Sequence, residues 1–233
     1  MSADNKRKST SHRVSPSWQV LNDDSPFSVK ESYKALRTNV VFSLPGGDAK
    51  CIGVTSATKS EGKSSTTLNL AISFAQIKKR VLVIDCDMRL PTIAMKLRVK
   101  GQLGLSNLLV GEGKFDATIR RITSLGISVL PAGNIPPDPT KLLESSQMET
   151  VLTVMKKYYD YIFLDLPPVN VVTDAAILSR HLDGFLLVVR HNVAEYREIQ
   201  SMLSQLKLAD AKILGIVYND APVSEKKYYK SYY

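Results

Sequence analysis

Short apolar runs, separated by polar and helix-patterned stretches, dominate the middle of this chain. Six of the runs are expected to be strands, at residues 51–55, 81–84, 127–130, 161–164, 184–189 and 213–218. Stretches with apolar residues at helical spacing separate most of them, notably residues 147–158 and 194–206. Near-continuous apolar strands that alternate with helices are typical of a parallel sheet covered on both faces. The pattern therefore predicts one α/β domain with a mostly parallel sheet.

The two ends of the chain have a different, polar pattern. Residues 1–28 are rich in Ser, Lys, Asn, Asp and Pro and are expected to be disordered. A helix is expected from about Val29 until Leu44-Pro45-Gly46-Gly47 ends it, so the predicted domain covers residues 29–221 and a tail covers 222–233. No apolar run approaches the roughly 20 residues needed to span a bilayer, and residues 1–22 lack the apolar core of a signal peptide. A cytoplasmic protein is expected.

Charge and cysteine content narrow the possible partners. The formal net charge is +9, but the positive residues are spread along the chain and form no long basic run. A solvated basic surface is therefore expected in preference to nucleic-acid binding, while contact with an acidic membrane surface stays open. The only two cysteines, Cys51 and Cys86, fall in or beside expected buried strands. We expect both to fill the core in a reducing compartment.

The loop after the first expected strand carries a phosphate-binding pattern. Residues 57–64 read Ala-Thr-Lys-Ser-Glu-Gly-Lys-Ser, which is the P-loop pattern with Ala57 in place of its first glycine. Backbone N–H groups of such a loop surround phosphate oxygens, and the next helix points its positive end at them. Lys63 is expected to reach the β- and γ-phosphates of ATP, and the Ser64 hydroxyl to bind Mg²⁺. The residues expected to bind the nucleotide are Thr58, Lys59, Ser60, Glu61, Gly62, Lys63, Ser64 and Ser65.

Three aspartates occupy the ends of two other expected strands. Asp85 and Asp87 follow the second strand, and Asp165 ends the fourth. Ligands of parallel sheets bind beyond the carboxyl ends of the strands, so all three carboxylates are expected to converge on the P-loop. Their combination with a P-loop favours Mg²⁺ coordination and activation of a water or hydroxyl group.

Together these motifs resemble the bacterial protein-tyrosine kinases of capsule and exopolysaccharide operons, from about Val29 to the C-terminus. Residues 85–91 look like the family's second acidic motif (Walker A′), residues 165–168 like its Walker B motif, and residues 133–139 like a further family segment. The sequence departs from the family at Leu166, where a threonine is usual, and at Asp138, where an asparagine is common. The resemblance implies a P-loop NTPase fold and transfer of the γ-phosphoryl group of ATP to tyrosine.

The resemblance also implies roles for individual residues. Lys63, Asp85, Asp87 and Asp165 are the expected catalytic residues, with Mg²⁺ held by Ser64, Asp87 and Asp165. We expect Asp85 to accept the proton of the tyrosine hydroxyl, although Asp85 and Asp87 could exchange roles. Asn219, after the last expected strand, resembles the adenine-recognising residue of related P-loop ATPases.

The two ends of the part of the chain that resembles this family imply self-association and regulation. Glu31, Lys34 and Arg37 are similar to the family's oligomerisation motif, with Lys34 in place of an arginine. The expected autophosphorylation sites are Tyr228, Tyr229, Tyr232 and Tyr233. The family implies a ring in which one subunit's tail enters its neighbour's active site, and a separate transmembrane activator that brings the kinase to the inner face of the plasma membrane. Other protein substrates remain open.

Two alternatives stand beside this hypothesis. A partitioning or positioning ATPase of the deviant P-loop class would hydrolyse ATP without a protein substrate. Such proteins carry a signature lysine early in the loop, where this chain has Thr58, with Lys59 one position displaced. The other alternative is a regulator that binds ATP only to assemble with a membrane partner. The intact lysine and the three aspartates of the expected site argue against it.

Overall fold

One seven-stranded sheet forms the centre of the computed structural model, which describes residues 20–222. The strand order is β3-β4-β2-β5-β1-β6-β7, and every neighbouring pair is parallel except β3 with β4. The strands are β1 Lys50–Ser56, β2 Val81–Asp85, β3 Arg120–Ile122, β4 Ile127–Leu130, β5 Tyr161–Asp165, β6 Gly184–Arg190 and β7 Ile213–Asn219. Because β1 lies between β5 and β6, the loop that follows it leaves from the middle of the sheet's carboxyl edge.

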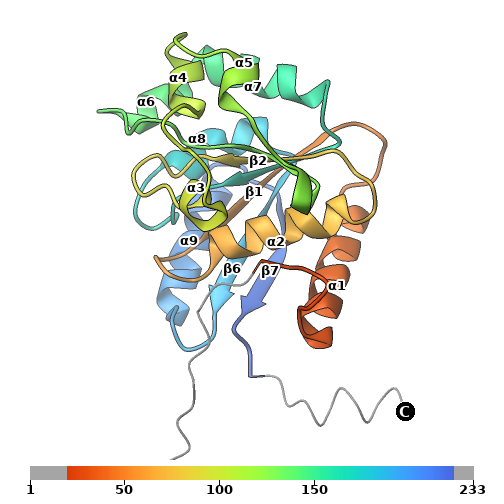
Figure 1. Ribbon diagram of the computed structural model, residues 1–233. Coiled ribbons are helices and arrows are strands. Elements are labelled where there is room, and N and C mark those ends of the chain that lie inside the picture. The colour runs from red at the N-terminus through yellow and green to blue at the C-terminus, as the bar shows by residue number, and fades with distance from the viewer. Residues whose placement is uncertain (1–19, 223–233) are drawn as a thin grey trace, which may run out of the picture.

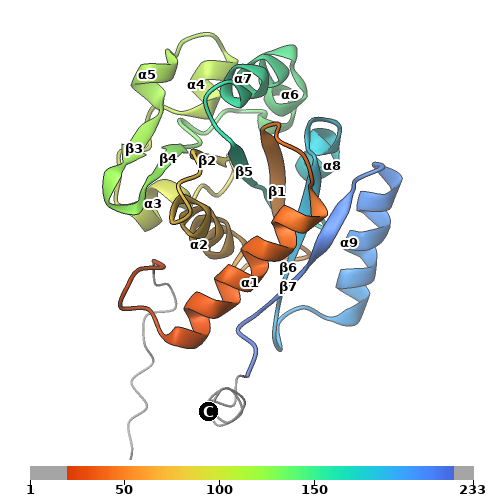
Figure 2. The ribbon, with the colours of Figure 1, turned by 90° about the vertical axis from the view of Figure 1, so that its right-hand side faces the viewer.

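Helices cover both faces of this sheet (Figures 1 and 2). The buried side chains of α1 and α2 join the hydrophobic cluster on one face, and those of α4, α6, α7, α8 and α9 join the cluster on the other. The helices are α1 Phe27–Ser43, α2 Lys63–Ala75, α3 Ile93–Leu97, α4 Leu105–Leu109, α5 Phe115–Thr118, α6 Pro139–Glu144, α7 Ser146–Lys156, α8 Asp174–Leu178 and α9 Tyr196–Leu208, with 3₁₀ turns at Thr123–Leu125 and Ser179–His181. The predicted α/β class with a mostly parallel sheet is confirmed.

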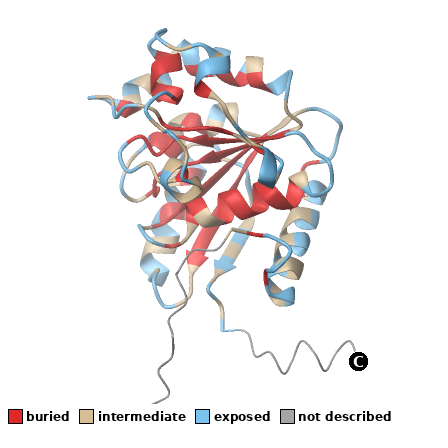
Figure 3. Cartoon of the chain, viewed as in Figure 1, coloured by how far each residue is buried: buried red, intermediate tan, exposed pale blue. Residues whose placement is uncertain are grey.

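The core forms where near-continuous apolar strands meet these helices. Every residue of β2 and β5 is buried, as Figure 3 shows for the middle of the sheet. On the α2 side, the Phe74 ring lies 4.2 Å from the ring of Tyr161 and 5.4 Å from that of Phe163, centroid to centroid. Cys51 and Cys86 are unpaired and fully buried, in agreement with their predicted place in the core.

All six predicted strands are present, each within two residues of its predicted bounds. The seventh strand, β3, was not predicted because it has three residues, two of them the arginines Arg120 and Arg121. It pairs antiparallel with β4 at the edge of the sheet, where a polar strand is tolerated. The predicted helices at 147–158 and 194–206 correspond to α7 and α9.

The predicted disordered segment, residues 1–28, is too long at its C-terminal end. Residues 20–28 have a defined place, because Leu21 is buried and its backbone N–H donates to the Asn69 side chain over 2.8 Å. Helix α1 begins at Phe27, just after Pro26. The buried Leu21 therefore anchors the polar segment that precedes this helix. The predictions for residues 1–19 and for the tyrosine tail lie outside the described residues. Within residues 20–222, no helix combines the length and the apolar character needed to cross a membrane.

Candidate functional site

The P-loop joins the central strand β1 to helix α2, as predicted. Gly62 has a φ of +92° and is the N-cap of α2, and Lys63 is the first residue of the helix. A Cβ atom at Gly62 would lie 2.1 Å from the side-chain nitrogen of Asn219, so both the backbone conformation and the space require glycine. The backbone N–H groups at the start of α2 therefore face the position where phosphates bind in such loops.

Glu61 is a buried carboxylate that holds the P-loop in shape. Its Oε1 accepts hydrogen bonds from the Thr58 backbone N–H (2.6 Å) and hydroxyl (3.1 Å), and its Oε2 accepts one from the Arg190 backbone N–H (3.2 Å). The side chain thus binds the loop and the end of β6. Any contact of Glu61 with a nucleotide would have to come from its backbone.

Asn219 lies beside the P-loop at the end of β7, but its amide contacts the protein. Its Nδ2 donates to the Glu61 carbonyl over 2.9 Å. Asn219 therefore positions the loop, and its predicted contact with adenine stays a prediction. Arg190 adds a second brace, since its guanidinium donates to the Ser60 carbonyl (3.2 Å) and pairs with Asp220 (2.9 Å).

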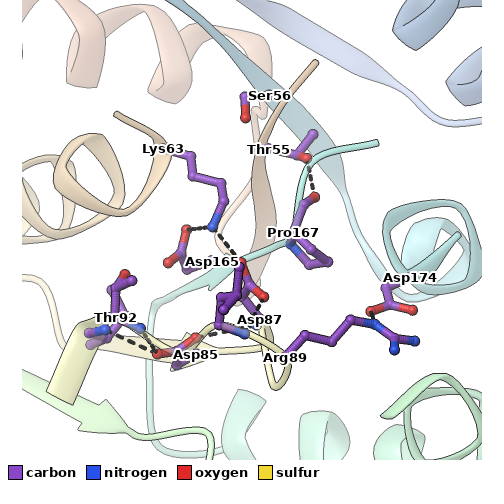
Figure 4. Close-up of polar contacts among 12 residues, drawn as sticks. Thr55, Ser56, Lys63, Asp85, Asp87, Arg89, Thr92, Asp165, Pro167 and Asp174 are labelled. Atoms are coloured by element: carbon purple, nitrogen blue, oxygen red, sulfur yellow. Dashed lines mark hydrogen bonds and ion pairs between the residues drawn. The ribbon is translucent and has the colours of Figure 1, made fainter. Parts of the chain in front are cut away.

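The Lys63 ammonium group lies between two of the predicted carboxylates (Figure 4). Its Nζ is 2.9 Å from Asp87 Oδ2 and 3.8 Å from Asp165 Oδ1. Burial lowers the pKa of Lys63, but Asp165 and Asp87 together raise it by more, and the resulting pKa lies above the ordinary value. Lys63 is therefore cationic at neutral pH, as a phosphate-binding lysine must be.

Asp165 is fully buried, and neither of its carboxylate oxygens has a hydrogen-bond partner among the described residues. Burial raises its pKa, while Lys63 and the Ser64 hydroxyl act in the opposite direction. Such unpartnered buried oxygens point to a group that completes them. Mg²⁺ and its waters fit this position, because Mg²⁺ is commonly held by one or two carboxylates together with substrate phosphates. Residues 20–222 contain no cluster of three His, Cys, Asp or Glu side chains that would form an all-protein metal site.

Asp85 and Asp165 are register partners on the adjacent strands β2 and β5, so their carboxylates lie side by side. Asp85 accepts hydrogen bonds from three backbone N–H groups, those of Asp87 (3.2 Å), Thr92 (3.1 Å) and Ile93 (3.1 Å). Burial, and then the charge of Asp165, raise the pKa of Asp85 well above its ordinary value. Figure 4 shows its carboxylate turned toward Thr92, whereas Asp87 meets Lys63. Asp87 and Asp165 therefore converge on the P-loop lysine as expected, whereas Asp85 lies beside Asp165 and binds the loop that follows β2.

A fourth buried aspartate was not predicted. Asp174, the first residue of α8, is fully buried; it accepts a hydrogen bond from Thr140 (2.8 Å) and lies 3.9 Å from the Arg89 guanidinium. Arg89 also donates to the Thr140 hydroxyl over 2.9 Å. This network ties the loop after β2 to α6 and α8. The sequence held no signal for it beyond an acidic residue at a helix start.

Lys96 is a second residue that sequence reasoning missed. It extends from α3 to the Ser65 hydroxyl, with a distance of 3.1 Å between Nζ and Oγ. Burial lowers its pKa. Ser65 belongs to the predicted nucleotide-binding set, so Lys96 brings a second amine to that site. Lys59, in contrast, is exposed at the turn of the P-loop.

The residues of the predicted oligomerisation motif face two directions. Lys34 pairs with Glu31 over 2.7 Å on the exposed side of α1. Arg37 instead donates to the Ser73 carbonyl of α2 over 2.5 Å, within the same chain. The motif therefore presents Glu31 and Lys34 to the outside, while Arg37 joins α1 to the helix that follows the P-loop.

Comparison with known proteins finds clear relatives of this chain. Residues 49–214 match the protein family described as the AAA domain. The putative tyrosine-protein kinase CapB of Staphylococcus aureus is 32% identical over 231 residues, which cover 98% of either chain.

Solved structures give the same result. The chimerical protein CapA2B2 superposes with a TM-score of 0.80 at 31% identity, covering 86% of this chain and 87% of that one. The kinase domain of the Escherichia coli tyrosine kinase ETK superposes with a TM-score of 0.79 at 30% identity, covering 84% and 79%. The fold is thus a P-loop NTPase fold, as the sequence predicted.

Proposed function

Because the chain belongs to the bacterial tyrosine-protein kinase family, we propose that it transfers the γ-phosphoryl group of ATP to tyrosine hydroxyls. The observation that carries the proposal is the meeting of Lys63 with Asp87 and Asp165 at the start of α2. A lysine kept cationic beside a P-loop supplies positive charge where the transferring group gains negative charge. Buried carboxylates next to it supply the sites for Mg²⁺ and for the acceptor's proton.

Ser64, Asp87 and Asp165 would hold Mg²⁺, which neutralises phosphate charge when it is bound. Asp165 has both oxygens available, and Ser64 is close enough to lower its pKa. Asp87 now pairs with Lys63, so nucleotide binding would redistribute these contacts between the ammonium group and the phosphates. Glu61, Asn219 and Arg190 keep the loop in the conformation that binds phosphate.

Asp85 is the residue that we assign to accept the tyrosine proton. A tyrosine hydroxyl has a pKa of about 10, so a more basic carboxylate accepts its proton more readily than an ordinary one. Burial and the adjacent Asp165 make Asp85 more basic in this way. Exchange of roles with Asp87 stays open, because Asp87 lies nearer to Lys63.

The proposed substrate is the C-terminal cluster Tyr228, Tyr229, Tyr232 and Tyr233 of a neighbouring subunit in a ring. Lys34 is exposed and Glu31 partly exposed on α1, so both are available for contact between subunits. Arg37 would have to leave the Ser73 carbonyl to join them. We further propose a separate transmembrane activator, a place at the inner face of the plasma membrane, and control of capsular or exopolysaccharide synthesis.

An anti-phosphotyrosine assay with ATP and Mg²⁺ tests the reaction. Three forms of the chain are compared: wild type, Lys63→Met, and a variant with the four tail tyrosines changed to phenylalanine. Signal in the wild type that is absent from both variants supports the proposal. Hydrolysis of ATP without phosphotyrosine, even with the activator's cytoplasmic segment present, would overturn it and favour the partitioning ATPase.

Mixing two variants tests transfer between subunits. The Lys63→Met chain keeps its tail but cannot phosphorylate it, whereas the four-phenylalanine chain keeps an intact site but offers no tail. Phosphotyrosine on the Lys63→Met chain in the mixture supports transfer between subunits. Its absence, with an active wild type, would show that the tail is phosphorylated within its own chain.

A further inference from the structure

A cavity among residues 20–222 lies at the other end of the sheet from the P-loop. It has a volume of about 1200 Å³ and opens at the starts of β2 and β4, where Val81 and Ile127 line it. The C-terminal ends of α2 and α7 border it, with α5 on a third side (Figure 2). No part of the catalytic site lines this cavity, so it needs a separate explanation.

The inner surface of the cavity is apolar and partly aromatic. Val81, Ile127 and Met155 are buried in its wall, and Phe115 and Tyr159 are partly buried beside them. A pocket of this kind binds the apolar body of a ligand, and the aromatic rings in its lining, Phe115, Tyr158 and Tyr159, favour a ligand that is itself aromatic.

The rim of the cavity is strongly cationic. Lys78, Lys79, Arg80, Lys114 and Arg121 all line it, and Asp116 is the one acidic residue in the described lining. Arg80 pairs with Asp160, and Lys79 also acts on that carboxylate by lowering its pKa. Across the described chain, no acidic side chain forms a salt bridge with Lys78, Lys114 or Arg121.

The dipole of α2 explains only part of this charge. Lys78 and Lys79 follow the C-terminus of α2, where positive side chains are favoured. Lys114 precedes α5 and Arg121 belongs to β3, so neither is close to the end of α2 in sequence, and both still line the same cavity. Unpaired cations from separate elements around an apolar interior fit an anionic group on an apolar body.

We propose that this cavity binds phosphotyrosine side chains on the C-terminal tail of a second copy of the chain, an inference that rests on the proposed tail phosphorylation. The phenyl ring would lie against the apolar wall, and the phosphate would meet Lys114 and Arg121 at the rim. Aspartate and glutamate lack the ring, and phosphoserine lacks it as well. A tyrosine phosphate has both parts, with a charge of about −1.5 to −2 and three strong acceptor oxygens.

The sheet topology assigns the tail to another copy. The tail follows β7, which is at one edge of the sheet, whereas β3 and β4 are at the opposite edge. The strand ends are opposed as well, because the tail leaves the carboxyl end of β7 and the cavity opens at the amino ends of β2 and β4. Docking would therefore link the tail of one phosphorylated subunit to the amino ends of β2 and β4 in another.

Fluorescence anisotropy with a labelled peptide of residues 222–233, synthesised with four phosphotyrosines, tests this proposal. The receptor is the full-length Lys63→Met chain, whose own tail stays unphosphorylated. We expect binding that weakens at least about tenfold when Lys114→Glu and Arg121→Glu are added, since charge-assisted hydrogen bonds to phosphate are lost. The unphosphorylated peptide should not bind.

A matched control carries Lys207→Glu and Lys212→Glu, which make the same charge change at exposed positions outside the cavity. This control should bind as tightly as the Lys63→Met chain alone, and phenyl phosphate should displace the peptide where inorganic phosphate at equal concentration does not. The proposal would be overturned if the control variant bound the peptide as weakly as the cavity variant, or if inorganic phosphate competed as well as phenyl phosphate. Either result would mean that the peptide is held only by general attraction between opposite charges. Because the peptide is made chemically, this result does not depend on whether the chain is an active kinase.

Discussion

At the scale of single residues, the carboxylate of Asp165 lowers the stability of the fold while it supplies oxygens that the proposed Mg²⁺ site needs. It is buried without a hydrogen bond, and its pKa is raised mainly by burial. A raised pKa means that the folded state favours the protonated form, so the ionised carboxylate destabilises the chain at neutral pH. Lys63, 3.8 Å away, offsets only part of this cost, and a bound Mg²⁺ would offset more of it.

We therefore expect Asp165→Asn to abolish tyrosine phosphorylation while stabilising the nucleotide-free chain by about 1 kcal/mol. Lys63 keeps Asp87 as its partner in this variant, so no unpaired cation is left. The measurement is urea denaturation alongside the phosphotyrosine assay. A variant that is less stable than wild type at pH 7 would contradict this account of Asp165.

The stability gain expected for Asp165→Asn should depend on pH, because the pKa of Asp165 is raised in the folded state. With a folded-state pKa above the unfolded value of about 3.9, the cost of ionising Asp165 is absent below the unfolded pKa and grows as the pH rises through the folded pKa. The stability difference between Asp165→Asn and wild type should therefore shrink as the pH falls from 7 toward 4. Denaturation curves across this range measure it, and a constant difference would exclude Asp165 as the source.

Glu61 is a positioning residue whose loss should weaken nucleotide binding. Its carboxylate satisfies the Thr58 and Arg190 backbone N–H groups, which would be left without partners in Glu61→Ala. We expect a loss of about 1–3 kcal/mol in stability and a Kd for ATP about tenfold higher. Glu61→Gln retains one acceptor oxygen, so its stability and its Kd for ATP should lie between those of wild type and Glu61→Ala. Calorimetric titration with a non-hydrolysable ATP analogue tests this, and unchanged affinity in Glu61→Ala would contradict it.

At the scale of elements, helix α1 is attached to α2 by polar contacts that compete with a role in self-association. Arg37 donates to Ser73, and the Tyr33 hydroxyl accepts a hydrogen bond from Asn69 over 3.3 Å. We expect Arg37→Ala to destabilise the single chain by about 1–2 kcal/mol, because the Ser73 carbonyl loses a charged donor. Glu31→Ala, at a partly exposed position, should change stability by less than about 0.5 kcal/mol and alter only self-association.

Denaturation curves and sedimentation velocity separate these two effects. If Arg37→Ala changes the oligomeric state at unchanged stability, Arg37 contacts a neighbouring subunit and its bond to Ser73 is not formed in solution. If Glu31→Ala leaves both quantities unchanged, the exposed pair with Lys34 is only a solvated contact.

The elements also show what the sequence could and could not predict. Near-continuous apolar runs identified six strands, and the placement of Asp85 and Asp165 at strand ends was enough to predict that they meet, since strands β2 and β5 pair in register. Short polar β3 had no comparable pattern. Asp174 and Lys96 were missed because each lies on a short helix that only the tertiary fold brings to its partners. No spacing pattern in the nearby sequence predicts these contacts.

Side-chain direction was the other limit of prediction. The P-loop pattern placed Glu61 near the phosphates, but whether its carboxylate faces the ligand or the protein depends on Arg190, which is 129 residues away in sequence. The same holds for Arg37, which belongs with Glu31 to the predicted oligomerisation motif but whose side chain reaches Ser73 of α2. Such choices are settled by tertiary hydrogen bonds, for which a buried donor or acceptor must find its partner.

At the scale of the whole molecule, phosphorylation of the tail should neutralise most of the chain's net positive charge. The formal net charge is +9. Four tyrosine phosphates add about −6 to −8 in total, at about −1.5 to −2 each, and leave about +1 to +3. A strongly basic chain is attracted to anionic surfaces, and a nearly neutral one is not.

We therefore expect the unphosphorylated chain to bind vesicles of phosphatidylglycerol and phosphatidylcholine in equal parts, and the phosphorylated chain to bind them several-fold more weakly. Cosedimentation at low ionic strength measures both forms, and added salt should release the unphosphorylated chain because surface charges are screened over a Debye length of about 10 Å at 0.1 M. Vesicles of phosphatidylcholine alone serve as the control, and the four-phenylalanine variant, incubated with ATP and Mg²⁺, should stay bound to the anionic vesicles. Equal binding of both forms to the anionic vesicles would show that net charge does not control membrane attraction, and would leave any regulated membrane contact to a specific partner.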